Sequence, residues 1–71
     1  MDENKFLRII GLRIRYLREK ANLTQESIDS HGVSYKHLQK IEAGKTNTTL
    51  RMLLRLSNAM NCKVKDFFVN E

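Results

Sequence analysis

The residues with the clearest binding chemistry lie between positions 34 and 45, where the sequence reads SYKHLQKIEAGK. Lys36 and Lys40 are four residues apart, so in a helix both ammonium groups would project from the same side. An ammonium group donates hydrogen bonds to phosphate oxygens and to the acceptor atoms of base edges. The same lysines would also suit a solvated helix that only packs on a core, so the rest of the sequence has to distinguish the two interpretations.

Size and charge limit the classes of function. The sequence has 71 residues, and 13 Lys and Arg against 8 Asp and Glu give a formal net charge of +5. A chain of this length forms one domain at most and leaves no room for the deep pocket of an enzyme. The positive charge favours an anionic partner: nucleic acid first, an acidic protein or a membrane surface second.

The residue types do not indicate catalysis or metal binding. No serine or cysteine nucleophile is set beside a base and no carboxylate pair is evident, so we predict that the protein is not an enzyme. Cys62, His31 and His37 lack the spacing of metal ligands, and a single cysteine cannot form an internal disulfide. We therefore expect no metal, no cofactor and no small-molecule ligand.

The sequence indicates no targeting or membrane-spanning segment. It opens with the polar stretch MDENKF, and Arg8 and Arg13 interrupt the apolar run that follows. Neither a signal peptide nor a membrane span fits this pattern. We expect a soluble, cytoplasmic protein without a membrane partner.

Helices are the elements expected to position these residues, because the chain has no proline and no sustained strand-like alternation. Apolar residues recur at intervals of three and four between positions 4 and 21, which predicts a first helix with one apolar stripe. The stripe consists of Phe6, Ile10, Ile14, Leu17 and Ala21.

Caps and stops locate the later helices. Favourable N-capping residues predict helices at about 25–31, 35–43 and 50–60. The capping residues are Thr24, Ser34 and Thr49. Gly32 lies in the turn after the second helix, and a last segment of one or two turns is expected within residues 64–70.

The remaining basic residues of the first and fourth helices are interpreted as solvated surface. They are Arg8, Arg13, Arg15, Lys20, Arg51 and Arg55.

Three motifs occur along this order of helices: Arg18, the Leu-Thr-Gln of residues 23–25 and the Ile-Glu-x-Gly of residues 41–44. With them, the sequence from about residue 10 to residue 68 resembles the lambda-repressor-like, Cro and Xre-type helix-turn-helix DNA-binding domains. The resemblance implies an all-α fold, a compact five-helix bundle in which residues 1–71 form one domain. The helix-turn-helix would span about residues 24–43.

The resemblance also implies which side chains meet DNA bases. The third helix would enter the major groove and present its first residues, and one a turn later, to base edges. The implied base-reading residues are Ser34, Tyr35, Lys36 and Lys40. Lys40 suits a phosphate equally well, and the sequence leaves that choice open.

Contacts with the DNA backbone are implied before and after this helix, where they fix register without reading sequence. Gln25 matches a phosphate-binding position at the start of the second helix, aided by free amides and the helix dipole. The implied phosphate-binding residues are Thr24, Gln25, His37, Lys45, Thr46 and Asn47.

Arg18 and Glu42 are assigned to structure. In the proteins that the sequence resembles, the matching arginine and glutamate pair inside the domain, and Glu42 falls on the core side of the expected third helix. A bidentate bridge between them would tie the first helix to the third. Loss of either residue should reduce binding by unfolding the domain.

One departure from the family pattern concerns the turn. The family usually has one more residue between the positions of Ile28 and Gly32, and a small residue where Asp29 stands. The departure predicts that the second helix ends early or that the turn tightens, which would change the direction in which the third helix leaves it.

The resemblance implies a transcriptional regulator, a repressor or an operon controller, that binds double-stranded DNA as a homodimer on an inverted repeat. Apolar residues near the C-terminus exceed the needs of one core, and they could either pack the chain ends within one molecule or form a dimer interface. We favour the dimer interface and expect it at Phe67, Phe68 and Val69. The alternative, from another class, is a protein-interaction module, such as an antitoxin or anti-repressor, whose main partner is a protein.

Overall fold

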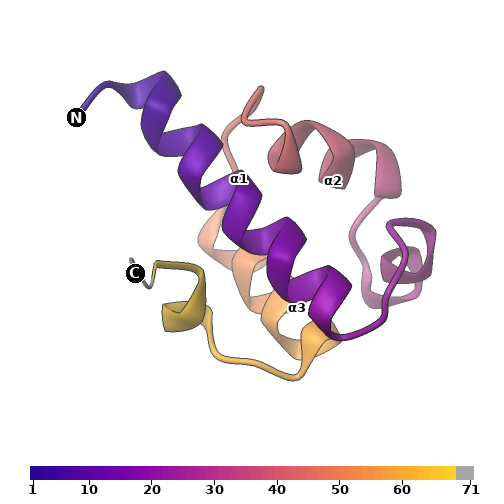
Figure 1. Cartoon of the computed structure of the whole chain (residues 1–71). Coiled ribbons are helices and arrows are strands. Elements are labelled where there is room, and N and C mark those ends of the chain that lie inside the picture. Colours follow the sequence, from indigo (N-terminus) through magenta and orange to yellow (C-terminus); the bar gives the residue numbers. More distant parts are fainter. Residues whose placement is uncertain (69–71) are drawn as a thin grey trace.

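The computed structural model describes residues 1–68 (Figure 1). It contains the α-helices α1 (Glu3–Lys20), α2 (Tyr35–Glu42) and α3 (Leu50–Met60), and the 3-10 helices η1 (Glu26–His31) and η2 (Val64–Phe68). No strand occurs in this part of the chain, which confirms the all-helical class. The second and last segments are 3-10 helices, so the α-helical part of the bundle is smaller than expected. Val69, which was expected at a dimer interface, lies outside the described residues.

Side-chain caps start α2 and α3 where the sequence predicted them. Ser34 and Thr49 each accept a hydrogen bond from the amide three residues further on, at 3.3 and 3.1 Å. Thr24 accepts from the Ser27 amide at 3.1 Å in the same way, although the N-cap residue of η1 is Gln25. Each cap satisfies one of the amides that have no partner within the first turn. At the other end of α3, Asn61 adopts the left-handed conformation with φ 54°, which stops the helix.

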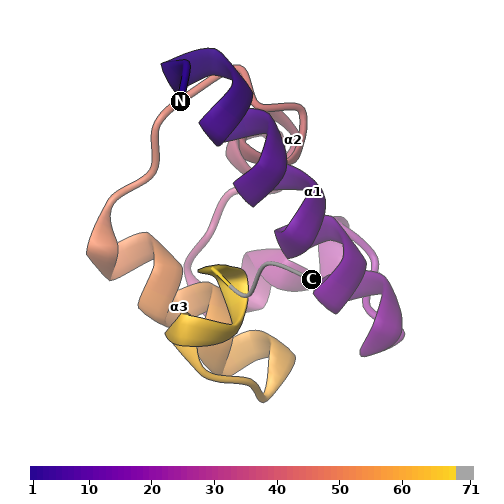
Figure 2. The same cartoon turned by 60° about the vertical axis from the view of Figure 1, so that its left-hand side comes forward.

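The long helix α1 lies across the molecule, with the other elements on two sides of it (Figures 1 and 2). On one side it packs against α2, and on the other against η2. At the base of the molecule α3 packs against both 3-10 helices. The element that was expected to bind DNA is therefore supported from α1 and from η1.

One hydrophobic core joins all five elements. Its buried apolar side chains are Ile10, Ile14, Ile28, Val33, Leu38, Ile41, Leu53, Leu56, Met60 and Phe67. The predicted apolar stripe of α1 is correct in its middle and wrong at its ends, since Phe6 is 44% exposed and Ala21 is exposed too. The reason is length: α1 has 18 residues, whereas α2 has 8 and α3 has 11, so the ends of α1 extend past the core.

The contact between α1 and α2 is made by backbone atoms. A Cβ added at Gly11 would meet the carbonyl oxygens of Ile41 and Glu42, the second at 2.7 Å. Gly44, which ends α2 with φ +72°, lies against Arg8 of α1 just as closely, since a Cβ there would meet the Arg8 Cγ at 2.7 Å. Only glycine permits this distance between the two helices.

The segment before α2 is a 3-10 helix that leads into a turn at Gly32. The helix does not end early, because η1 runs to His31, and Gly32 then adopts the left-handed conformation with φ 85°. A 3-10 helix rises about 2.0 Å per residue, against about 1.5 Å for an α-helix. A 3-10 segment with one residue fewer can therefore span the distance that a longer α-helical segment would cover.

Candidate nucleic-acid interface

Helix α2 divides its side chains between the core and the solvent. Leu38, Ile41 and Glu42 are buried. The exposed positions recur at intervals of three and four and therefore share one face: Lys36, Gln39, Lys40 and Ala43. The structure thus places both predicted lysines on the solvent face of the helix.

Gln39 lies between these lysines and was not among the residues predicted to read bases. Its position three residues after Lys36 and one before Lys40 could have identified it, because any residue at that spacing lies on the same face. A glutamine amide can both donate to and accept from an adenine edge at N6 and N7. It completes a polar face whose donors and acceptors suit the major groove.

The first residues of α2 are partly occupied by contacts within the protein. The Ser34 Oγ accepts from the His37 amide at 3.3 Å, so its lone pairs serve the cap while its hydroxyl hydrogen can still donate. Tyr35 is half-buried, and its backbone N–H donates to the Asp29 Oδ1 at 2.8 Å. His37 is half-buried as well.

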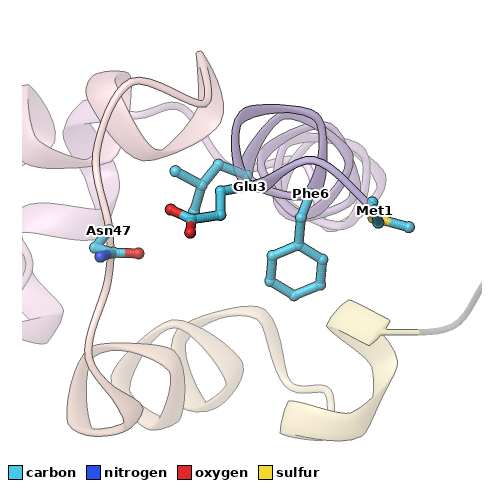
Figure 3. A pocket seen from close by; sticks show the side chains of 5 residues that line it. Met1, Glu3, Phe6 and Asn47 are labelled. Carbon is cyan, nitrogen blue, oxygen red and sulfur yellow. The ribbon is translucent and has the colours of Figure 1, made fainter.

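The predicted phosphate-binding residues lie at the two ends of α2. Thr24 is exposed and its Oγ1 accepts from the Ser27 amide of η1, which meets the N-terminal end of α2 (Figure 1). After the C-terminal end of α2, Lys45 is exposed and Thr46 is half-buried. Asn47 belongs to the same loop, but it lines a pocket with Glu3 and its side chain points toward α1 (Figure 3).

A buried network fixes α2 from its inner side. The Arg18 Nε donates to the Glu42 Oε2 at 2.7 Å, and a second guanidinium nitrogen donates to the Oε1 at 3.1 Å. Gln25 donates to the same Oε1 at 3.0 Å, and Arg18 also donates to the carbonyl of Leu23 at 2.7 Å. The network joins α1, the start of η1 and α2.

The guanidinium of Arg18 keeps its charge in this network. The hydrogen bond that it donates to Glu42 raises the pKa of Arg18 above its usual value despite the opposing effect of burial, so the guanidinium stays protonated. Gln25, predicted to contact a phosphate, uses one amide hydrogen for Glu42 and keeps a second that can donate to another partner. The buried network therefore orients a side chain at the proposed surface.

Two of the arginines that were interpreted as solvated surface donate to backbone carbonyls of other parts of the chain. The Arg13 Nε donates to the backbone oxygen of Asp66 at 2.9 Å and so connects α1 with η2. Arg55 of α3 donates to the carbonyl of Gly32 at 3.1 Å, in the turn before α2. Both partners are backbone carbonyls of distant segments, which the sequence pattern cannot reveal.

Two kinds of site were sought in the described part of the chain: clusters of possible metal ligands and membrane-spanning helices. Within residues 1–68, no group of three or more His, Cys, Asp or Glu side chains is placed to hold a metal ion. No helix in the same range is long and apolar enough to cross a membrane. Burial, with a smaller effect of Asp66, raises the pKa of the half-buried Cys62 thiol.

A short helix, a turn built on a left-handed glycine and a basic helix locked to its neighbours define a helix-turn-helix domain. The comparison with protein families agrees, since the helix-turn-helix family model matches residues 14–67. This chain belongs to that family, which confirms its resemblance to the lambda-repressor-like and Xre-type proteins.

Similar proteins are known from archaea. Two uncharacterised HTH-type transcriptional regulators of Archaeoglobus fulgidus are each 33% identical to the chain over 58 residues, which cover 80% of it and 82% and 83% of those proteins. A third uncharacterised HTH-type transcriptional regulator, from Methanocaldococcus jannaschii, is 32% identical over 60 residues, 83% of this chain and 91% of that protein.

A solved structure has the same fold. The restriction-modification controller protein C.AhdI from Aeromonas hydrophila matches with a TM-score of 0.86 and 28% sequence identity. The match covers 90% of this chain and 98% of that one.

Proposed function

We propose that residues 1–71 form one domain that binds double-stranded DNA with sequence specificity and thereby regulates transcription. The observation that carries this proposal is the exposed face of α2, where Lys36, Gln39 and Lys40 project away from the core. The major groove of DNA is wide enough to admit an α-helix, and the polar side chains on this face can form hydrogen bonds with base edges there. The names of the archaeal relatives support a role in transcription. We assign neither a catalytic step nor a cofactor to the domain.

In the proposed complex, base reading and backbone contacts come from different elements. Lys36 and Gln39 read base edges together with Ser34 and Tyr35, and Lys40 contacts either a base or a phosphate. The phosphate contacts come from the segments around α2: Thr24, Gln25, His37, Lys45, Thr46 and Asn47.

We further propose that the protein acts as a homodimer on an inverted repeat, with recognition helices roughly 34 to 36 Å apart. A groove beside α1 supports this proposal. We call it the α1 groove; its lining includes Phe6, Leu7, Thr48, Leu53 and Phe68. Phe6 projects from α1 toward the space between α3 and η2 (Figure 3).

The α1 groove and the neighbouring helix α3 have exposed apolar surface that a second copy would cover. Phe68, in the groove lining, is 48% exposed. Helix α3, which contributes Leu53 to the lining, also exposes Leu50 and Leu54, one turn apart, to 81% and 53%. Of the predicted interface residues within the described part of the chain, Phe67 is only 1% exposed and belongs to the core, whereas Phe68 remains available for the interface.

Selection of bound sequences from a random duplex pool, at two salt concentrations, tests the proposed function. We expect an inverted repeat. Lys36→Ala should then weaken binding by about 1 to 3 kcal/mol and relax the preference at one base pair, whereas Lys45→Ala should weaken all sequences alike. Lys65→Ala is the matched control, because it removes the same charge from η2 on the other side of α1.

A protein-interaction module remains the second candidate, and the exposed apolar surface at the α1 groove is the observation that favours it. Weak binding that is blind to sequence and disappears with salt would reject the DNA proposal. In that case a protein partner at the α1 groove would be the function to test next.

A further inference from the structure

The turn between η1 and α2 is held by side chains from two different elements. The Asp29 Oδ1, on η1, accepts from the Tyr35 amide at 2.8 Å. Arg55, on α3, donates to the Gly32 carbonyl at 3.1 Å, and the Gly32 amide donates back to the Asp29 carbonyl at 3.1 Å. The conformation of the turn is therefore fixed from both sides.

The bond from Asp29 differs in kind from the ordinary cap of α2. Ser34 caps the His37 amide, but this cap belongs to the chain that leads directly into α2 and moves with the helix. Asp29 lies six residues before Tyr35 on the preceding helix, so its bond fixes the direction of α2 relative to η1. An ionised carboxylate that accepts from a backbone amide makes a strong, charge-assisted hydrogen bond.

We propose that Asp29, supported by Arg55, is a positioning residue that sets the angle at which α2 meets DNA and so determines which bases its side chains reach. The proposal rests on the proposed DNA-binding function. Asp29 also carries a negative charge beside the first turn of α2, where it disfavours contact with a phosphate. The carboxylate therefore lowers affinity for all sequences while it preserves discrimination among them.

The experiment measures the ratio of affinities for the selected duplex and a random duplex, at a temperature where circular dichroism shows each variant fully folded. Asp29→Ala should lower this ratio by about tenfold, the effect of one lost base contact. Asp29→Asn keeps the acceptor oxygen and removes the charge, so we expect it to retain the ratio and to bind both duplexes more tightly. Ser30→Ala is the control, because its hydroxyl bonds only within η1, to the Ser27 carbonyl.

Arg55→Met tests the same turn through Gly32 and keeps the proposal testable if Asp29→Ala does not fold. It should lower the ratio by about threefold with little change in fold. An unchanged ratio in folded Asp29→Ala or Arg55→Met would overturn the inference, as would an equal loss in the Ala and Asn variants of Asp29. Failure of the wild-type protein to discriminate between the duplexes would instead overturn the proposed function, and with it the inference.

Discussion

The two flanks of α1 are built in opposite ways. Toward α2 the helix makes a closed contact, in which Gly11 meets backbone oxygens and the ion pair between Arg18 and Glu42 is buried. Toward α3 and η2 it borders the α1 groove, adjoined by a pocket of about 380 Å³ that shares Phe6 with it.

The difference shows how a small domain divides its few contacts. A core of this size buries only part of the apolar surface. The closed flank uses polar groups and glycines, which permit only one geometry, and it holds the helix proposed to read DNA. The open flank uses apolar side chains, which tolerate several partners, and it leaves surface for association.

The largest expected effect on stability comes from a substitution that disrupts the closed flank. Glu42→Ala leaves the Arg18 guanidinium buried without its carboxylate, which should cost about 3 to 5 kcal/mol. Because a domain of this size is stable by roughly 4 to 10 kcal/mol, urea unfolding followed by circular dichroism should show a protein close to its folding threshold. Arg15→Ala is the control, since its pair with Glu19 is exposed and should be worth less than about 0.5 kcal/mol. Equal effects of the two changes would show that the closed flank is not held by its buried pair.

A smaller loss is expected from Gly11→Ala. The added methyl would meet the backbone oxygens of Ile41 and Glu42 and would push α2 away from α1. Overpacking typically costs about 1 to 3 kcal/mol, and the better helix propensity of alanine returns up to about 1 kcal/mol. We expect a net loss of about 1 to 2 kcal/mol in the same unfolding measurement. Leu12→Ala, at an exposed neighbouring position, should change stability by no more than about 0.5 kcal/mol; a stabilised Gly11→Ala protein would mean that the helices can separate freely.

Substitutions on the open flank should change the affinity of dimerisation and leave the free energy of unfolding nearly unchanged. The double change Leu50→Ser and Leu54→Ser removes exposed apolar surface from α3, the helix that contributes Leu53 to the α1 groove, and should weaken dimerisation at least about tenfold. Sedimentation equilibrium measures the dimer affinity, and urea unfolding of the monomer should change little because both side chains are exposed. Leu12→Ser, at a leucine of α1 that is 60% exposed, is the control. A dimer that the double variant leaves intact must use another surface.

The smallest effect is expected from loss of the hydrogen bond between Arg13 of α1 and the backbone of η2. Arg13→Ala removes the hydrogen bond to the Asp66 carbonyl and should cost about 1 kcal/mol. Hydrogen exchange should show faster exchange of the amides of η2 and no change in α2. Faster exchange in α2 as well would indicate that the two flanks of α1 are coupled.

Sequence reasoning succeeded where the signal is local, as at a helix cap. It also succeeded where two residues of opposite charge were expected to pair, as Arg18 and Glu42 do. The caps at Ser34 and Thr49 follow from residue type and spacing, and the structure shows both. It failed where the answer depends on other elements: Phe6 continues the apolar period of α1 but lies beyond the core, and Arg55 finds a backbone carbonyl on another segment. The 3-10 form of η1 was not predicted. The length of the segment and its capping residues are compatible with either an α-helix or a 3-10 helix.

By itself the sequence determined the family, the order of the helices and the solvent face of α2, because caps, periodicity and motif spacing act over a few neighbouring residues. Only the tertiary structure decided which flank of α1 is closed and that Asp29 fixes the start of α2. These features depend on distances between segments that meet only after folding. A shift of a few ångströms between two such segments decides whether a donor and an acceptor form a hydrogen bond or remain exposed to water.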